Sequence, residues 1–130
     1  GNDIQENLKK FDQLLASKNN LQGLSREEFV DEVVQLFSLL NYIAPFRAGN
    51  EATQRIFFWQ LAKGAGHKID FSVTTEERIT RACIDSMTLK GDIAHKEMKD
   101  LFEDISNPKS ITILKDFFKR IPKLERERLN

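Results

Sequence analysis

Apolar residues recur along this chain mainly at the three- and four-residue spacing of amphipathic helices. A first helix is predicted over Asp3–Ser17, and a second begins after Ser25, where Glu28 completes the pattern of a capping box. The second helix carries a broad apolar stripe, which is typical of a largely buried helix. The stripe consists of Phe29, Val30, Val33, Val34, Leu36, Phe37 and Leu40. Pro45 disfavours the α conformation at Ala44 and therefore ends this helix.

A third helix is predicted from about Glu51 to Lys63, and it is apolar almost all round. Its apolar residues are Ile56, Phe57, Phe58, Trp59 and Leu61. We therefore expect the second and third helices to be the most buried pair, with the loop at 44–50 held between them. Because three consecutive aromatic rings cannot all face inward, one of residues 57–59 is expected to be exposed and to be a candidate partner site.

Three more helices are predicted in the second half of the chain. Thr74 and Glu77 resemble a capping box, Gly91 a C-cap and Asp92 the cap of the next helix, and the pair at 107–108 separates the last two helices. The buried positions expected in these helices are Ile79, Cys83, Met87, Met98, Leu101, Phe102, Ile105, Ile111, Leu114, Phe117 and Phe118. No strand pattern or internal repeat is evident, so the predicted fold is all-α, a bundle of about six helices.

Composition limits the function classes without naming one. The 130 residues correspond to one domain, predicted at 1–122, with Pro122 ending its last helix and a charged tail or linker at 123–130. Twenty basic and twenty acidic residues give zero net charge, which lacks the basic excess of nucleic-acid or anionic-membrane binding. Cys83 is the only cysteine, so no internal disulfide can form, and no apolar run is long enough to span a membrane.

The segment from Ala44 to Arg55 is the best candidate for a chemical site. Gly49 permits a positive φ, and Asn50 is a good helix cap before a strongly helical run. Such a loop directs backbone N–H groups at one point, where the helix dipole also favours an anion. In contrast, His67 and His95 have no cysteine or carboxylate at metal-ligand spacing, so we expect surface or cap histidines and no metal site.

The order of residues in this segment resembles the signature loop of the Fic family, His-Pro-Phe-x-acid-Gly-Asn-Gly-Arg-x-x-Arg. The residues at matching positions are Pro45, Phe46, Gly49, Asn50 and Arg55. Residues 21–29 and 60–72 follow the family's pattern, and residues 101–108 are similar to Fic domains of bacterial type IV secretion effectors. The resemblance covers about residues 21–108 and implies a Fic-like helical domain.

The resemblance also implies an activity, which this sequence departs from at four places. Fic proteins transfer AMP from ATP to a target hydroxyl. The motif histidine is the base, the acid holds Mg²⁺, the Gly-Asn-Gly backbone forms the anion hole and the arginines bind the outer phosphates. Here Ala44, Ala48 and Ala52 replace the histidine, the acid and the first arginine, and Glu51 replaces the last glycine. Loss of a general base alone lowers a rate by about 10²–10⁴-fold. We therefore expect no catalytic residue, weak or absent ATP and Mg²⁺ binding, and no cofactor.

Glu51 would oppose a phosphate directly. Two like charges about 4 Å apart repel by about 4 kcal/mol at an effective dielectric constant near 20. The same carboxylate is stabilised by the helix N-terminus, so our hypothesis is that Glu51 occupies the anion site as a plug. Arg55 is expected to bind a phosphate or to pair with a carboxylate such as Glu51, and Phe46 is expected to anchor the loop by packing.

These departures favour a catalytically degenerate Fic-like domain that acts as an interaction or regulatory module with a protein partner. It would lie in the cytoplasm, or in a host cell as part of a secreted effector. The alternative is an enzyme with residual or diverged protein adenylyltransferase activity. A helical adaptor that never bound a nucleotide is a third reading, against which the motif remnants argue.

Overall fold

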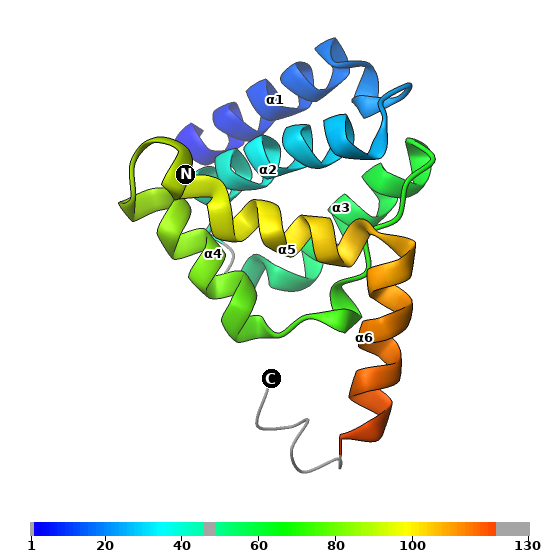
Figure 1. Cartoon of the computed structure of the whole chain (residues 1–130). Helices are drawn as coiled ribbons and strands as arrows, with labels where there is room; N and C mark the ends of the chain where they lie inside the picture. Colours follow the sequence, from blue (N-terminus) through cyan, green and yellow to red (C-terminus); the bar gives the residue numbers. More distant parts are fainter. Residues whose placement is uncertain (1, 46–48, 122–130) are drawn as a thin grey trace. The chain divides into compact units, whose positions relative to one another are not determined.

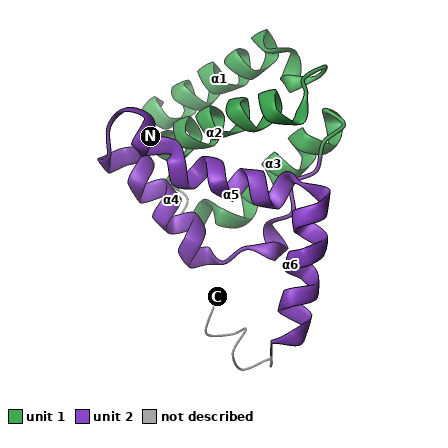
Figure 2. Cartoon of the chain, in the orientation of Figure 1, with its two compact units in different colours: residues 1–67 green, residues 68–130 purple. Residues whose placement is uncertain are grey.

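The computed structural model describes residues 2–45 and 49–121, and over these residues the chain is helical without a strand, which confirms the all-α prediction (Figure 1). Its elements are α1 (Asn2–Ser17), η1 (Asn19–Leu21), α2 (Arg26–Ile43), α3 (Glu51–Gly64), η3 (Phe71–Val73), α4 (Glu76–Thr88), η4 (Gly91–His95), α5 (Lys96–Ser106) and α6 (Pro108–Arg120). Pro122 and the tail at 123–130 lie outside the described residues. The chain forms two compact units, residues 1–67 and 68–130 (Figure 2).

In the first unit, α1 packs against α2 and η1, and η1 also contacts α3. The predicted capping box opens α2: the Ser25 N–H donates to Glu28 Oε1 over 3.0 Å, and the Glu28 N–H donates to Ser25 Oγ over 3.2 Å. Every residue of the predicted α2 stripe is buried. The helix ends at Ile43, and Ala44 adopts the extended conformation that Pro45 requires.

The residues of η1 form a left-handed turn that no sequence pattern predicted. Asn19, Asn20 and Leu21 have φ values of +54°, +51° and +62°. This conformation costs about 1–2 kcal/mol per residue for side chains other than glycine, although asparagine tolerates it better than most. Leu21 has no exposed surface, and burying a leucine contributes about 1.5–3 kcal/mol, which offsets much of that cost.

The expectation that α3 would belong to the most buried pair is wrong. Its buried residues are Gln54, Phe58, Leu61 and Ala62, whereas Ile56 is 56% and Trp59 47% exposed. Residues three or four apart share one helix face, so a run of consecutive apolar residues must turn some of them to solvent. Trp59 is the exposed ring that the sequence led us to expect, and the ammonium of Lys63 lies 5.1 Å from its ring centroid.

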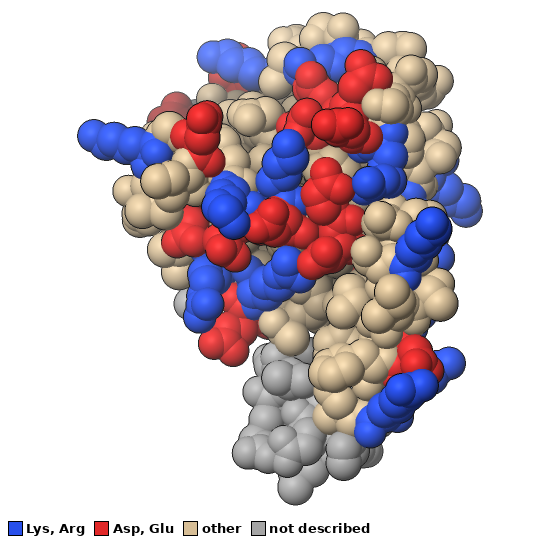
Figure 3. All heavy atoms as spheres, in the orientation of Figure 1, with Lys and Arg blue, Asp and Glu red and all other residues tan. Residues whose placement is uncertain are grey.

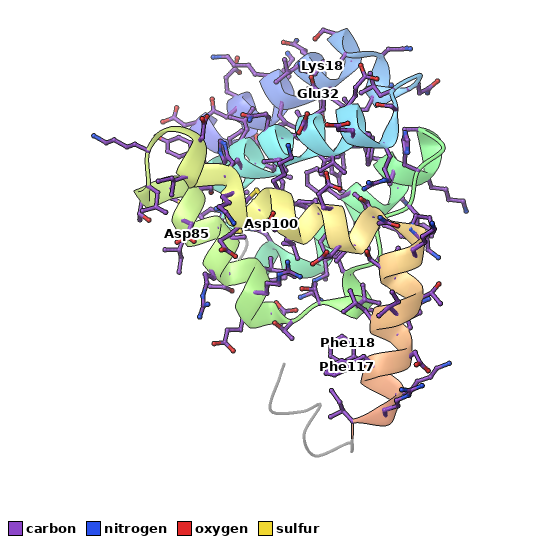
Figure 4. All side chains as sticks on the ribbon, in the orientation of Figure 1. Lys18, Glu32, Asp85, Asp100, Phe117 and Phe118 are labelled. Carbon is purple, nitrogen blue, oxygen red and sulfur yellow. The ribbon has the colours of Figure 1, made fainter. Side chains whose placement is uncertain are left out.

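In the second unit, α4 packs on α5 and η4, and α5 packs on α6. The predicted core positions at Ile79, Cys83, Met98, Leu101, Phe102, Ile105 and Ile111 are buried. Burial also raises the pKa of the Cys83 thiol to about 11. Two positions predicted to be buried are exposed instead, Met87 at 56% and Phe117 at 53%. The Phe117 ring packs edge-on against Phe118, with centroids 5.7 Å apart (Figure 4).

Three predicted boundaries in this unit are wrong by one to three residues. Thr75 rather than Thr74 caps α4, since its Oγ1 accepts from the Arg78 N–H over 3.1 Å. Gly91 does not cap α4 but begins η4 with a φ of +68°, and α5 therefore starts at Lys96 rather than after Asp92. Neighbouring residues of similar capping ability compete, and the tertiary contacts decide between them.

The predicted break between α5 and α6 is confirmed. Asn107 caps α6 by accepting the Lys109 N–H over 3.0 Å, and Pro108 takes the first helical position.

Asp70, at the start of η3, contacts both α5 and α6. Its N–H donates to the Ile105 carbonyl over 2.9 Å, and its carboxylate accepts from the Ser72 N–H over 2.9 Å and lies 3.2 Å from the Lys115 ammonium. Burial raises the pKa of the Asp70 carboxyl, but the hydrogen bonds from Ser72 and the charge of Lys115 together lower it by more. The net result is a pKa below the ordinary aspartate value.

We expect Asp70→Asn to lower the free energy of unfolding at pH 7 by about 0.5–1 kcal/mol, because asparagine keeps the turn but removes the charge facing Lys115. Since the folded-state pKa is depressed, this stabilisation is present above the ordinary value of 3.8 and is lost as pH falls through the folded-state pKa. Urea unfolding at a series of pH values measures it. Asp116→Asn, which removes an exposed partner of Arg120, is the control and should cost less. A difference for Asp70→Asn that is equal at pH 7 and at about pH 3 would contradict the assignment.

Candidate functional site

The candidate site is the loop that joins α2 to α3. Phe46 and Ala48 of the predicted motif lie outside the described residues, so the structure reports on its two flanks. Gly49 has a φ of +83°, as its role in the turn predicted. A Cβ built on Gly49 would meet no atom within 4 Å, so the backbone conformation, and not lack of space, favours glycine here.

Asn50 does not cap α3 with its side chain, contrary to the prediction. It stands at the N-cap position in the αR conformation, where its side chain accepts no hydrogen bond from the helix. Its Nδ2 group instead donates to the Pro45 carbonyl over 3.1 Å. Asn50 therefore closes the loop across five residues and does not occupy the first N–H groups of α3.

Gln54 forms a second hydrogen bond across the loop, which the sequence analysis did not predict. Its side chain is 4% exposed, and Nε2 donates to the Ala44 carbonyl, the acceptor that follows the end of α2. Its Oε1 atom is buried without a hydrogen-bond partner in the part of the chain that the structure describes. A signal was present, because Gln54 shares one helix face with Phe58 and Leu61, and a polar residue on a buried face needs a partner.

Glu51 begins α3 and is partly exposed. At this position the helix dipole stabilises a negative charge. Pairing of Arg55 with a carboxylate such as that of Glu51 stays a prediction. Occupation of the anion site by Glu51 stays a prediction. Ala52 is exposed, and Arg55 is partly buried one turn further along the helix.

A hollow of about 260 Å³ lies beside this loop within the first unit. Its lining residues are Leu8, Phe11, Asp12, Leu40, Ala44, Asn50, Thr53, Gln54 and Phe57. Asp12 is the charged member of this set, and an aspartate repels the phosphates of a nucleotide. The rest of the lining is uncharged and largely apolar, so the hollow suits an apolar group.

The other candidates for chemistry are structural. His67 was predicted to be a surface or cap histidine, and this prediction is wrong. Its ring stacks on Phe29 with centroids 4.5 Å apart, and its Nε2 atom lies 2.8 Å from the Leu24 carbonyl oxygen. His95 ends η4. Within residues 2–45 and 49–121, no three histidine, cysteine or acidic side chains lie together as a metal site would require.

Charges of both signs are mixed on the face of the molecule that Figure 3 draws. Acidic and basic side chains alternate on the face drawn in Figure 3, and several form ion pairs, such as Lys18 with Glu32 at 3.1 Å (Figure 4). This face lacks the single-sign basic field that is typical of nucleic-acid binding. None of the described helices is long and apolar enough to cross a membrane.

No family model matches the chain. A protein adenylyltransferase of Bartonella henselae is 53% identical to it over 117 residues, which are 90% of this chain and 21% of the relative. The crystal structure of the N-terminal Fic domain of a VirB-translocated effector of Bartonella sp. 1-1C is 77% identical, with a TM-score of 0.79. That match covers 85% of this chain and 51% of the solved one.

The N-terminal Fic domain of a VirB-translocated effector of Bartonella quintana was solved with bound ADP. It is 50% identical to this chain, with a TM-score of 0.72, over 85% of this chain and 50% of the solved one. The chain therefore spans about half the length of these solved structures and about a fifth of the Bartonella henselae protein.

The hydrogen bond from Gln54 to the Ala44 carbonyl predicts an effect on the stability of the fold. Gln54→Leu leaves the Ala44 carbonyl without its donor, which lowers stability, and removes the unpartnered Oε1 atom, which recovers part of the loss. We expect a net decrease of about 1 kcal/mol in the free energy of unfolding, measured by urea denaturation. Gln60→Leu, an exposed position on the same helix, is the matched control and should change stability by less than about 0.5 kcal/mol. Equal effects of the two variants would show that the Gln54–Ala44 hydrogen bond contributes nothing to the free energy of unfolding.

Proposed function

Because this chain belongs to the Fic family, we propose that it is a catalytically inactive Fic domain retained as an interaction or regulatory module. The observation that carries the proposal is the replacement of the motif's chemistry at Ala44, Ala48, Glu51 and Ala52, while Gly49 and Asn50 still match the motif.

Each replacement removes one requirement of AMP transfer. The methyl group of Ala44 cannot accept a proton from a target hydroxyl, and Ala48 offers no oxygen to Mg²⁺. Ala52 provides no cation for the outer phosphates, and transfer from a nucleotide depends on such neutralisation of charge. Glu51 adds a negative charge at the helix N-terminus, where a phosphate would otherwise be stabilised. The losses fall on separate functions, so no single remaining group compensates for them.

The alternative is a residual or diverged adenylyltransferase. The ADP bound to the Bartonella quintana Fic domain favours it, because that domain has a similar fold and 50% sequence identity. Arg55 of this chain stands at a phosphate-binding position of the motif. Nucleotide binding and catalysis are therefore tested separately.

The proposal also covers the kind of protein to which this domain belongs and the place where it acts. The matched solved structures come from proteins described as VirB-translocated effectors. We infer that this chain is likewise part of an effector delivered into a host cell, where it contacts a protein partner. The zero net charge and the mixed charges on the face drawn in Figure 3 are consistent with a protein and not a nucleic acid as that partner.

The test is calorimetric titration of ATP with Mg²⁺ into the wild-type chain, Glu51→Gly and Glu51→Gln. We expect no binding by the wild type and weak binding by both variants, because each removes the charge that opposes the phosphates. Glu27→Gln removes a carboxylate from the first turn of α2 and is the control. Wild-type binding at micromolar ATP would contradict the plugged site.

Catalysis is measured independently with labelled ATP and proteins of a host-cell extract. No transfer of labelled AMP is expected from the wild type. Transfer that depends on this chain would overturn the proposal and establish the enzyme alternative.

A further inference from the structure

A second hollow lies in the first unit, between the left-handed turn of η1 and the helix α3. Its volume is about 270 Å³, and its lining residues are Leu15, Asn20, Gln22, Phe57, Gln60, Leu61 and Gly64. We call it the η1 hollow. It shares Phe57 with the hollow beside Ala44 but contains no residue of the 44–55 segment. It can therefore bind a ligand whether or not the proposed function is correct.

The lining of the η1 hollow is uncharged, although 31% of the residues in this chain are charged. Leu15 and Leu61 are buried and Phe57 is partly exposed, so together they form an apolar wall. An uncharged lining holds neither a metal ion nor a phosphate, since both need compensating charge. The ligand must itself be neutral and carry an apolar group.

Three carboxamides surround this wall, those of Asn20, Gln22 and Gln60. All three side chains are exposed, and none forms a hydrogen bond with another residue that the structure describes. Each carboxamide offers two N–H donors and one carbonyl acceptor. The hollow therefore presents both donors and acceptors around an apolar surface.

The backbone fixes the point from which one of these side chains, that of Asn20, extends. Asn20 is the middle residue of three consecutive residues with positive φ, and Leu21 anchors that turn with a fully buried side chain. Unfavourable backbone conformations persist where the surrounding structure fixes them, and they are concentrated at binding sites. Here the buried leucine fixes the position of Asn20 at the rim of the hollow.

We propose that the η1 hollow binds an uncharged peptide segment of a partner protein. One apolar side chain of that segment packs against Leu15, Phe57 and Leu61, and its flanking peptide groups pair with the three carboxamides. A side-chain carboxamide and a peptide unit are both amides, so the N–H of each can donate to the carbonyl oxygen of the other. At about 270 Å³, the hollow is smaller than the usual 300–1,000 Å³ of small-molecule pockets, and it suits one side chain.

The probe for the test is N-acetyl-leucinamide, which carries two peptide groups and one apolar side chain without a charge. In ¹H–¹⁵N NMR titrations of the 130-residue chain, it should shift the backbone signals of Phe57, Leu61 and Gly64 and the side-chain amide signals of Asn20 and Gln60. N-acetylglycinamide lacks the side chain, and N-acetyl-leucine adds a carboxylate. Both are expected to bind at least fivefold more weakly.

Two variants locate the site without disturbing the fold. Gly64→Leu places a side chain at the rim, where a Cβ meets nothing within 4 Å and the backbone φ is not positive, so the variant should fold. It should reduce probe binding at least tenfold, whereas Gln13→Leu, at an exposed position outside the hollow, should not change it. Asn20→Gly keeps the positive φ but deletes the carboxamide, and it should weaken binding about two- to tenfold.

The proposal is overturned if the probe shifts signals elsewhere on the chain, or if Gly64→Leu binds it as well as the wild type does. It is also overturned if glucose, an uncharged ligand rich in hydroxyl groups, binds the hollow more tightly than N-acetyl-leucinamide. In that case the three carboxamides serve a carbohydrate.

Discussion

The structure around the motif depends on which donors form hydrogen bonds with the carbonyl groups just after the end of α2. Pro45 stops the helix, and the last carbonyl groups of a helix need donors from elsewhere. Gln54 gives its Nε2 donor to the Ala44 carbonyl, and Asn50 gives its Nδ2 donor to the Pro45 carbonyl. These two bonds fix both flanks of the loop to the start of α3. The described flanks of the loop are thus held together by two side-chain hydrogen bonds.

The proposed loss of chemistry is compatible with an intact fold, because different side chains hold the described flanks of the loop. The residues that hold the loop, Gly49 and Gln54, act through backbone conformation and a buried hydrogen bond. The positions at which the motif would serve AMP transfer are occupied here by Ala44, Ala48, Glu51 and Ala52. The side chains that hold the flanks are thus not the side chains that the proposed loss of activity concerns.

The sequence predicted what short-range contacts decide. The capping box at Ser25 and the break at Asn107 involve partners within three residues, and the helical periodicity of α2 and α5 identified their buried faces. It failed where distant partners decide. Gln54 reaches back ten residues, and His67 lies against a carbonyl 43 residues earlier. No local pattern names these partners, because the chain must fold before the groups meet.

Phe57 shows how one apolar residue can separate two chemically different surfaces. On one side it lines the hollow that contains Ala44, where Asp12 supplies a negative charge. On the other side it lines the η1 hollow, which has carboxamides and no charge. The charge of a ligand therefore decides which side accepts it: a cationic or apolar group suits the first, and a neutral group with donors and acceptors suits the second. These two hollows thus differ in the ligand that each would accept, although a single ring lines both.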